Sequence, residues 1–262
     1  KKIIFRRHLE LIKDCFWSSL LRWRPYDFSI IPIALISEIY EEFLKTEIGG
    51  KQTARTGTYY TPHSLVEFIL NEQLPWADKN NSNYKLKIID PACGSGIFLV
   101  EAYKRLVDRW KYCHKGKKID AGILKSLLLN SIYGVEINDQ GIKVAAFSLY
   151  LTMLNYLEPI YIWNKVKFPF LIFYPDNTEK NRQGYNLFHL SSLADGIFSQ
   201  QEYDLVVGNP PFKRGKLDDD VYKYLSNLGF AQEYAMAFLH RAPKLSPKGK
   251  IALVATSKIL FN

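Results

Sequence analysis

The hydrophobic pattern changes its period along the chain. In residues 9–23 and 36–45, apolar residues recur at three- and four-residue spacing between charged ones, which predicts amphipathic helices. A polar stretch with two adjacent glycines follows at residues 49–57 and predicts a boundary. We therefore expect a helical prefix over residues 1–48 and a second domain over residues 49–262.

The second part alternates between short apolar runs and longer amphipathic segments. The predicted strands cover residues 85–90, 131–137, 186–190, 203–209 and 250–257. The predicted helices cover residues 64–70, with Thr61 as cap and Pro62 in the first turn, and 96–110, 139–157 and 233–245. Such alternation predicts a doubly wound α/β domain with a mostly parallel sheet and helices on both faces. In these domains ligands bind beyond the carboxyl ends of the strands.

Composition narrows the class of protein. A chain of 262 residues that is 47% hydrophobic can bury a large core, which excludes a disordered or fibrous protein. The formal charge of +9 suits a polyanionic partner such as nucleic acid, although a basic soluble protein fits it equally well. Three cysteines without CxxC spacing favour neither a disulfide framework nor a zinc site, and indicate a reducing compartment. The sequence shows neither an apolar run of about 20 residues nor a signal peptide, so we expect no membrane span.

The first strand is followed by the loop DPACGSG, residues 90–96. Gly94 and Gly96 allow a tight turn and a close approach of the backbone to a ligand. Leu99 takes the place of the third glycine of a dinucleotide fingerprint, which argues against a nicotinamide cofactor. Asp90 would repel a pyrophosphate and attract a cation, so S-adenosylmethionine, with its sulfonium and ammonium, fits better. A plain strand-to-helix turn is the structural alternative.

The next strand ends in Glu136. A carboxylate at the tip of the strand beside the glycine loop can accept hydrogen bonds from both ribose hydroxyls of a nucleoside. A single glutamate at a strand end is more often a solvated surface group. Its pairing with Asp90 favours the binding role.

The strand over residues 203–209 ends in the group Asn209, Pro210, Pro211 and Phe212. An exocyclic amino group on a nucleobase is a poor nucleophile because its lone pair is delocalised into the ring. The side-chain carbonyl of Asn209 and the backbone carbonyl of Pro210 could accept both of its hydrogens and free that lone pair, while the prolines stiffen the turn. Phe212 could stack on the base, a contact worth about 1–3 kcal/mol. The alternative is an ordinary Asn-Pro turn.

Four motifs in this order resemble those of the amino-methyltransferases that modify adenine in DNA at N6. They are GTYYTP at residues 57–62, DPACGSG at 90–96, YGVEIND at 133–139 and GNPPF at 208–212. The placement of GTYYTP before the glycine loop is similar to the gamma class. IYEEFL, residues 39–44, resembles the helical lead-in of type I modification subunits and of fused type IIG restriction-modification enzymes. The likeness covers residues 36–262.

The resemblance implies a class I S-adenosylmethionine-dependent fold and assigns roles to individual residues. Thr61 would contact the cofactor's methionine part, Glu136 its ribose, and Ile137 would pack on its adenine ring. The implied cofactor-binding residues are Tyr59, Tyr60, Thr61, Asp90, Ala92, Gly94, Gly96, Glu136 and Ile137. The residues implied to hold the target adenine are Asn209, Pro210, Pro211 and Phe212. Where family members often have an aspartate after the third strand, this chain offers Ser191 or Ser192, and Asp195 a little later.

The resemblance also implies double-stranded DNA as a partner, with the target adenine flipped out of the duplex. Lys213, Arg214 and Lys216 directly follow the turn and could contact phosphates, although a solvated charge run explains them nearly as well. The family normally continues with a target-recognition domain, or works with a separate specificity subunit, so we expect the catalytic domain to be incomplete at residue 262. Enzymes of this kind act in the bacterial or archaeal cytoplasm.

We expect no metal in this site, because methyl transfer needs none. The aspartates at residues 218–220 fit the cap and dipole positions of a helix start, and His63 and His189 fit packing or surface positions. Methylation of protein glutamine, of guanine in RNA or of cytosine at N4 stays open as an alternative. A non-catalytic subunit that binds cofactor and DNA is the alternative from another class.

Overall fold

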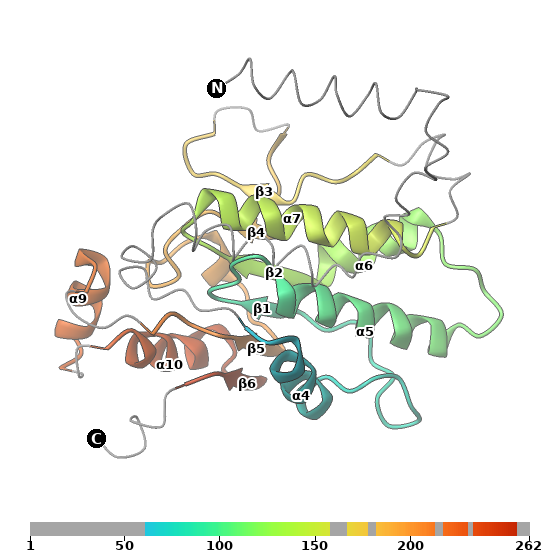
Figure 1. Ribbon diagram of the computed structural model, residues 1–262, viewed down its shortest axis with the longest axis horizontal. Coiled ribbons are helices and arrows are strands. Elements are labelled where there is room, and N and C mark those ends of the chain that lie inside the picture. Colours follow the sequence, from blue (N-terminus) through green and yellow to red (C-terminus); the bar gives the residue numbers. More distant parts are fainter. Residues whose placement is uncertain (1–60, 158–166, 178–181, 213–216, 230–232, 256–262) are drawn as a thin grey trace, which may run out of the picture. The chain divides into compact units, whose positions relative to one another are not determined.

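The computed structural model describes residues 61–157, 167–177, 182–212, 217–229 and 233–255 (Figure 1). All of them belong to one compact unit. The helical prefix predicted over residues 1–48 and the boundary predicted at residues 49–57 lie outside the described residues. Across the ranges that are described, no helix has both the length and the apolar character that a bilayer span requires.

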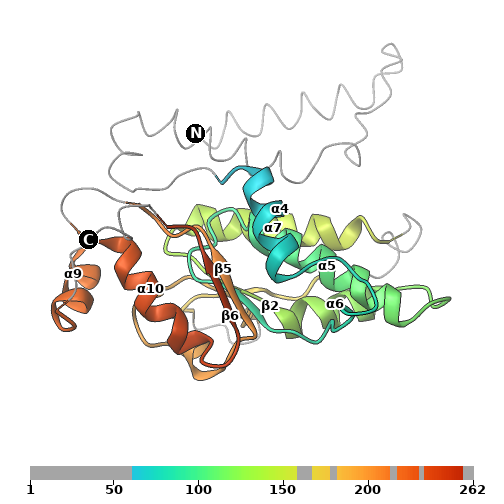
Figure 2. The same ribbon diagram turned by 90° about the horizontal axis from the view of Figure 1, so that it is seen from below.

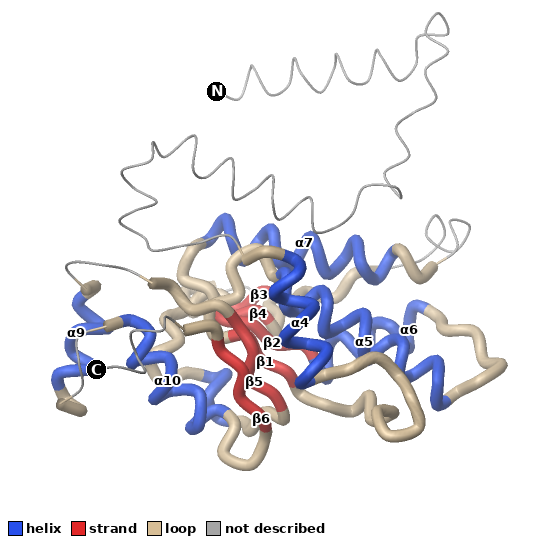
Figure 3. Tube along the Cα trace, turned by 60° about the horizontal axis from the view of Figure 1, so that its bottom comes forward, coloured by secondary structure: helices blue, strands red, loops and turns tan. Residues whose placement is uncertain are grey.

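A parallel sheet forms the centre of this unit (Figure 3). Its described strands are β1 (Ile88–Asp90), β2 (Ile132–Val135), β3 (Ile172–Phe173), β4 (Leu187–Phe188), β5 (Leu205–Gly208) and β6 (Lys250–Leu253). They lie in the order β3-β4-β2-β1-β5-β6, and every described pair is parallel. The predicted doubly wound α/β architecture is therefore confirmed.

Helices connect these strands. They are α4 (His63–Gln73), α5 (Ile97–Cys113), α6 (Ala121–Ser131), α7 (Asp139–Leu154), α9 (Asp219–Ser226) and α10 (Tyr234–Leu245), with a short 3₁₀ helix at Ile197–Gln200. Neither α6 nor β3 was predicted from the pattern. The predicted cap of α4 is wrong, since Pro62 occupies the N-cap position and no side chain caps this helix.

Alternate residues of the central strands face opposite sides of the sheet, and each side has its own core. Ile88 and Val207 pack in one apolar cluster with residues of α4, α5, α6 and α7. Ile89 and Val206 pack in another cluster, with Leu245 of α10. Figure 2 shows α10 on one side of β5 and β6 and α4 and α5 on the other. Both faces of the central strands are therefore covered, which explains why β1, β2 and β5 are buried along their length, whereas the edge strand β6 is partly exposed.

Candidate active site

The order of the strands reverses at β1, because the chain proceeds to β2 on one side and later returns to β5 on the other. Such a switch point opens a crevice at the carboxyl ends of the strands. Asp90 ends β1, Glu136 follows β2 and Asn209 follows β5. All three residues line one cavity of about 280 Å³. The structure thus brings together the three strand-end residues that the sequence singled out.

The glycine loop between β1 and α5 makes the tight turn expected of it. Gly94 and Gly96 have φ of 51° and 86°, a conformation that favours glycine. A Cβ on Gly96 would also lie 2.9 Å from the Cβ of Ala145 on α7. The loop is tied to the neighbouring strand end, since the amide of Gly94 donates to Oε2 of Glu136 at 2.9 Å. Gly96 therefore shapes the loop while Gly94 also lines the cavity.

Asp90 is a buried carboxyl group at the floor of the cavity, with 1% of its surface exposed. Its Oδ1 accepts a hydrogen bond from the amide of Ala92 at 2.9 Å. Burial raises the pKa of Asp90 to about 8, the Ala92 bond opposes the rise, and the charge of Glu136 adds to it. Asp90 therefore loses its proton more readily when a cation lies beside it. A Cβ on Gly208 would meet Oδ1 at 2.4 Å, so the neighbouring strand must have glycine there.

Glu136 is held by two backbone amides. Its Oε2 accepts from Gly94, and its Oε1 accepts from Asn138 at 2.7 Å. Burial raises the pKa of Glu136, while these amides lower it in part. Each oxygen keeps a second lone pair for a ligand hydroxyl. Ile137 follows on the cavity lining and is 69% exposed, so its side chain offers an apolar surface to a planar ring.

Asn209 has one end of its amide group fixed and the other end unused. Its Nδ2 donates to Oγ1 of Thr61 at 3.0 Å. Its Oδ1 is buried and has no hydrogen-bond partner within the described part of the chain. A buried acceptor without a partner is costly, so a donor from a bound substrate would stabilise it. Pro210 is buried, Pro211 lines the cavity, and Phe212 is half-buried.

Another wall of the cavity comes from the loop after β4 and from α9 and α10. Ser191 donates a hydrogen bond through Oγ to Oδ2 of Asp220 at 2.6 Å, and both residues line the cavity. Ser192 lines it too, and its Oγ donates to the carbonyl of Pro91. Asp220 lies in the first turn of α9, as expected of a dipole partner, but the sequence did not indicate its place in the cavity. Tyr234 and Phe238 of α10 were also missed; only their aromatic character on an amphipathic helix could have signalled them.

The predicted site residues divide into three groups. Those that line the cavity are Thr61, Asp90, Ala92, Gly94, Glu136, Ile137, Ser191, Asn209 and Pro211. Those that are described but do not line it are Gly96, Asp195, Pro210 and Phe212. Those that lie outside the described residues are Tyr59, Tyr60, Lys213, Arg214 and Lys216. The side chain of Asp195 is 90% exposed, and its carboxylate forms an ion pair of 2.8 Å with Arg241.

The donor set matches a cationic nucleoside ligand. One cavity contains the buried carboxyl group of Asp90, the carboxylate of Glu136 and the exposed side chain of Ile137. The two oxygens of Glu136 can accept from the two hydroxyls of a ribose. His189, which is not part of the cavity lining, donates a hydrogen bond of 3.0 Å through Nε2 to the carbonyl of Ile137. The residues present therefore fit S-adenosylmethionine.

Comparisons with known proteins show which proteins this chain resembles. The adenine-specific methyltransferase PglX of Streptomyces coelicolor is 28% identical over 207 residues, a match that covers 66% of this chain and 17% of PglX. The type II methyltransferase M.BstVI of Geobacillus stearothermophilus is 27% identical over 218 residues, covering 79% of this chain and 34% of that protein. The solved DrdV–DNA complex shares the fold with a TM-score of 0.57 at 15% identity, covering 87% of this chain and 23% of that chain.

This chain therefore spans only a small part, 17% and 34%, of the two curated relatives. The doubly wound fold that the motifs led us to expect is confirmed by the parallel sheet, and the DrdV–DNA complex shares this fold. A model of the N-6 DNA methylase family matches residues 33–262, which is most of the sequence. The chain belongs to the N-6 DNA methylase family.

Proposed function

We propose that this chain carries the site that methylates adenine in DNA at N6, as part of a restriction-modification system. The observation that carries the proposal is Oδ1 of Asn209, which is buried and has no hydrogen-bond partner among the described residues, in the same cavity as Asp90 and Glu136. An acceptor without a donor, beside a site for a cationic nucleoside, is what transfer to an amino group requires. The family and the relative PglX, an adenine-specific methyltransferase, support the same reaction.

The cofactor side of the cavity would bind S-adenosylmethionine, which supplies an electrophilic methyl group when bound. Asp90 would stabilise its positive charge, and Glu136 would accept hydrogen bonds from its ribose hydroxyls. Ile137 would pack on its adenine ring. Tyr59, Tyr60, Ala92 and Gly94 stay proposed contacts that the family resemblance implies.

The pair of Ser191 and Asp220 would take the place of the aspartate that related enzymes have after the third strand. The bond between them holds the Asp220 carboxylate at the cavity, where a second lone pair can accept from an exocyclic amino group. Asp195 is less suited to this contact, because its carboxylate is exposed and paired with Arg241. We therefore assign the third contact to Asp220.

On the substrate side, Oδ1 of Asn209 and the backbone carbonyl of Pro210 would accept the two hydrogens of the adenine amino group. This draws the nitrogen toward a tetrahedral shape and makes its lone pair available for attack. Pro210 and Pro211 restrict the turn, and Phe212 would stack on the base. The methylated nitrogen then loses its extra proton readily, so the chain needs no strong general base.

The target adenine must leave the duplex to reach this cavity, at a cost of a few kcal/mol. Lys213, Arg214 and Lys216 would hold the distorted backbone, and sequence recognition would come from a target-recognition domain or a specificity subunit. Replacing any one of these three with alanine should reduce the slope of log affinity against log salt by about 1. Fluorescence anisotropy with a duplex at several salt concentrations measures that slope.

The proposed reaction is tested with the natural full-length protein and labelled S-adenosylmethionine. Unmethylated genomic DNA, ribosomal RNA and a release factor serve as acceptors, and mass spectrometry of the hydrolysed products identifies the modified group. We expect N6-methyladenine in DNA. Label in N4-methylcytosine, in guanine or in glutamine would replace the proposal with one of those reactions. Normal cofactor binding without transfer to any acceptor would support a non-catalytic binding subunit.

A further inference from the structure

Thr61 contacts the proposed catalytic amide directly, although 148 positions separate the two residues in the sequence. The Thr61 residue is 8% exposed, and its Oγ1 accepts the Nδ2 hydrogen of Asn209 at 3.0 Å. A carboxamide has a donor end and an acceptor end, so a bond that fixes one end also determines where the other end faces. Here the fixed donor leaves Oδ1 as the end available to a ligand.

We propose that Thr61 is a positioning residue whose hydroxyl holds the Asn209 amide in the orientation that presents Oδ1 to the target amino group. The inference rests on the proposed function and adds a role to the cofactor contact implied for Thr61. If the amide turned over, Nδ2 would face the adenine amino group, and two donors would meet. Transfer would then slow even with the cofactor fully bound.

The position of Thr61 depends on helix α4, which starts two residues later. Pro62 restricts the backbone between them, and its carbonyl accepts from the amides of Leu65 and Val66 at 3.0 and 3.2 Å. Thr61 is thus attached to the first turn of α4 through a stiff link. Any shift of α4 relative to the sheet would move the hydroxyl away from Asn209.

Buried charges hold α4 on α5. Arg105 of α5 is fully buried, and its Nη2 donates to Oε2 of Glu67 and to Oδ1 of Asn71, both at 2.9 Å. Both acceptors lie on α4, so one guanidinium bonds two successive turns of that helix. A shift of α4 along α5 would separate the buried guanidinium from its partners, and removing a partner from a buried charge is costly. The contact therefore resists such a shift.

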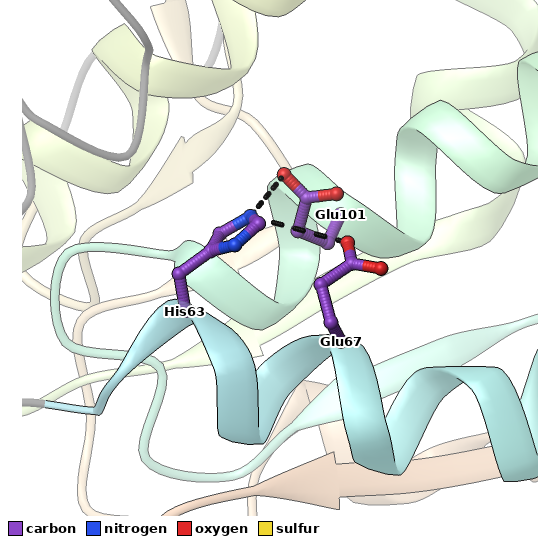
Figure 4. Close-up of side chains that lie close together, drawn as sticks. All are labelled: His63, Glu67 and Glu101. Atoms are coloured by element: carbon purple, nitrogen blue, oxygen red, sulfur yellow. Dashed lines mark ion pairs between the residues drawn. The ribbon is translucent and has the colours of Figure 1, made fainter.

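A second contact ties the first turn of α4 to the same helix. Figure 4 shows His63 and Glu67 on α4 directed toward Glu101 on α5. The Nε2 of His63 lies 3.4 Å from Oε1 of Glu101, whose side chain is 3% exposed, and Lys104 binds that oxygen at 2.6 Å. Burial alone would raise the pKa of Glu101, but Lys104 and His63 outweigh it and lower the pKa below its usual value.

The ligating atoms of His63, Glu67 and Glu101 lie within 4.8 Å of one another, a spacing that a metal ion could use. Both carboxylates already have a cation, however, because Arg105 binds Glu67 and Lys104 binds Glu101. The charges of the group are therefore balanced by the chain's own residues. We interpret the cluster as the anchor of α4 rather than as a metal site.

The test compares Thr61→Val with Thr61→Ser in the natural full-length protein. Valine keeps the shape of threonine and removes the hydroxyl, whereas serine keeps the hydroxyl. We expect Thr61→Val to lower kcat about 10- to 100-fold at saturating S-adenosylmethionine, whatever change the loss of the cofactor contact makes in the Kd, because Nδ2 of Asn209 loses its acceptor. Thr61→Ser should retain most of the kcat. Single-turnover transfer and calorimetric cofactor binding give the two numbers.

Two outcomes would overturn the inference. Wild-type kcat in Thr61→Val with a raised Kd would assign the hydroxyl to the cofactor alone, and an equal loss of kcat in the valine and serine variants would indicate a structural role. Absence of transfer by the wild type would instead refute the proposed function. The inference is still testable then, because the side-chain amide signal of Asn209, assigned in ¹⁵N-asparagine spectra by its loss in Asn209→Ala, must shift in Thr61→Val and not in Thr61→Ser.

The anchor is tested with Glu67→Ala against Glu72→Ala, an exposed glutamate on the same helix. We expect Glu67→Ala to lower kcat about twofold to tenfold and to add little to Thr61→Val, since both act through one contact. Glu72→Ala should leave kcat unchanged. Full additivity of Glu67→Ala and Thr61→Val would contradict the coupling of α4 to Asn209.

Discussion

The two walls of the cavity are built differently. One wall consists of strand ends, where Asp90 is buried, Glu136 is half-buried, and both accept hydrogen bonds from backbone amides. The other wall is made by Ser191 and Asp220, whose bond joins a loop to the first turn of a helix, and Asp220 is exposed. Strand ends belong to a packed sheet and cannot shift alone. We therefore expect the buried wall to supply the charge and geometry for the proposed reaction, and the exposed wall to add contacts that select the ligand.

The largest expected effect on cofactor binding comes from the buried wall. Asp90→Asn keeps the size of the side chain and removes its charge. Charge-assisted hydrogen bonds contribute about 1.5–3 kcal/mol, so we expect the Kd for S-adenosylmethionine to rise about 10- to 100-fold. Isothermal calorimetry without DNA measures this Kd. An unchanged Kd would show that Asp90 is not the group that meets the cation.

The same variant should be more stable than the wild type. Folding raises the pKa of Asp90 from 3.8 to about 8, so the folded state binds a proton that the unfolded state releases. The wild type therefore loses stability as the pH rises from about 4 to about 8, and Asp90→Asn does not share this loss. We expect the difference in Tm, measured by scanning calorimetry, to favour the variant and to grow with pH in that range. A higher Tm for the wild type at pH 8 would contradict the burial of an unpaired charge.

Cofactor binding to the wild type should depend on pH for the same reason. Below pH 8 the cation must bind to a protonated Asp90 or displace its proton, so affinity should increase as the pH rises toward 8. The limiting slope is about tenfold per pH unit. Calorimetry between pH 6 and about 7.5, in buffers of different ionisation enthalpy, should show proton release in the wild type. Asp90→Asn should show a flatter profile, and equal slopes for both proteins would exclude Asp90 as the titrating group.

The exposed wall should matter less. Asp220→Ala removes the partner of Ser191 and the proposed acceptor for the cofactor's amino group. A typical hydrogen bond contributes about 0.5–1.5 kcal/mol, so we expect a twofold to tenfold rise in the Kd for S-adenosylmethionine. Asp219→Ala is the matched control, because Asp219 lies in the same first turn of α9 but not in the cavity lining. The control should leave the Kd unchanged. Equal effects of both changes would assign the loss to the helix end rather than to a ligand contact.

The buried wall was predictable from the sequence, whereas the exposed wall was predictable only in part, because Ser191 was named as a candidate contact and Asp220 was not. Asp90, Glu136 and Asn209 each end an apolar run, and parallel strands bring their carboxyl ends together, so the pattern alone placed them at one edge. Asp220 ends no strand. An aspartate in the first turn of a helix is expected whether or not its side chain also lines a cavity, so the sequence pattern did not distinguish the two cases. Only the packing of α9 against the loop after β4 reveals that contact.

The missed elements have local causes. β3 has two residues, which is too short for a period of two to be visible. α6 ends directly where β2 begins, so one apolar run covers both, and its clearest signal was Asp120, whose side chain accepts from the amide of Ile123. Thr61 was predicted to cap α4 because its neighbours in sequence allow it. In the folded chain its hydroxyl bonds Asn209 instead, a partner that local sequence cannot indicate.

The central claim is that Asn209 performs the transfer in the cavity that Asp90 and Glu136 prepare for the cofactor. The most direct test is single-turnover transfer to unmethylated DNA by the full-length protein and its Asn209→Ala variant, with cofactor affinity measured in parallel. We predict a loss of transfer of about 1,000-fold or more, because the amino group loses its acceptor, with a Kd for S-adenosylmethionine within about twofold of the wild type. Transfer at the wild-type rate by Asn209→Ala, with the cofactor bound normally, would contradict the account.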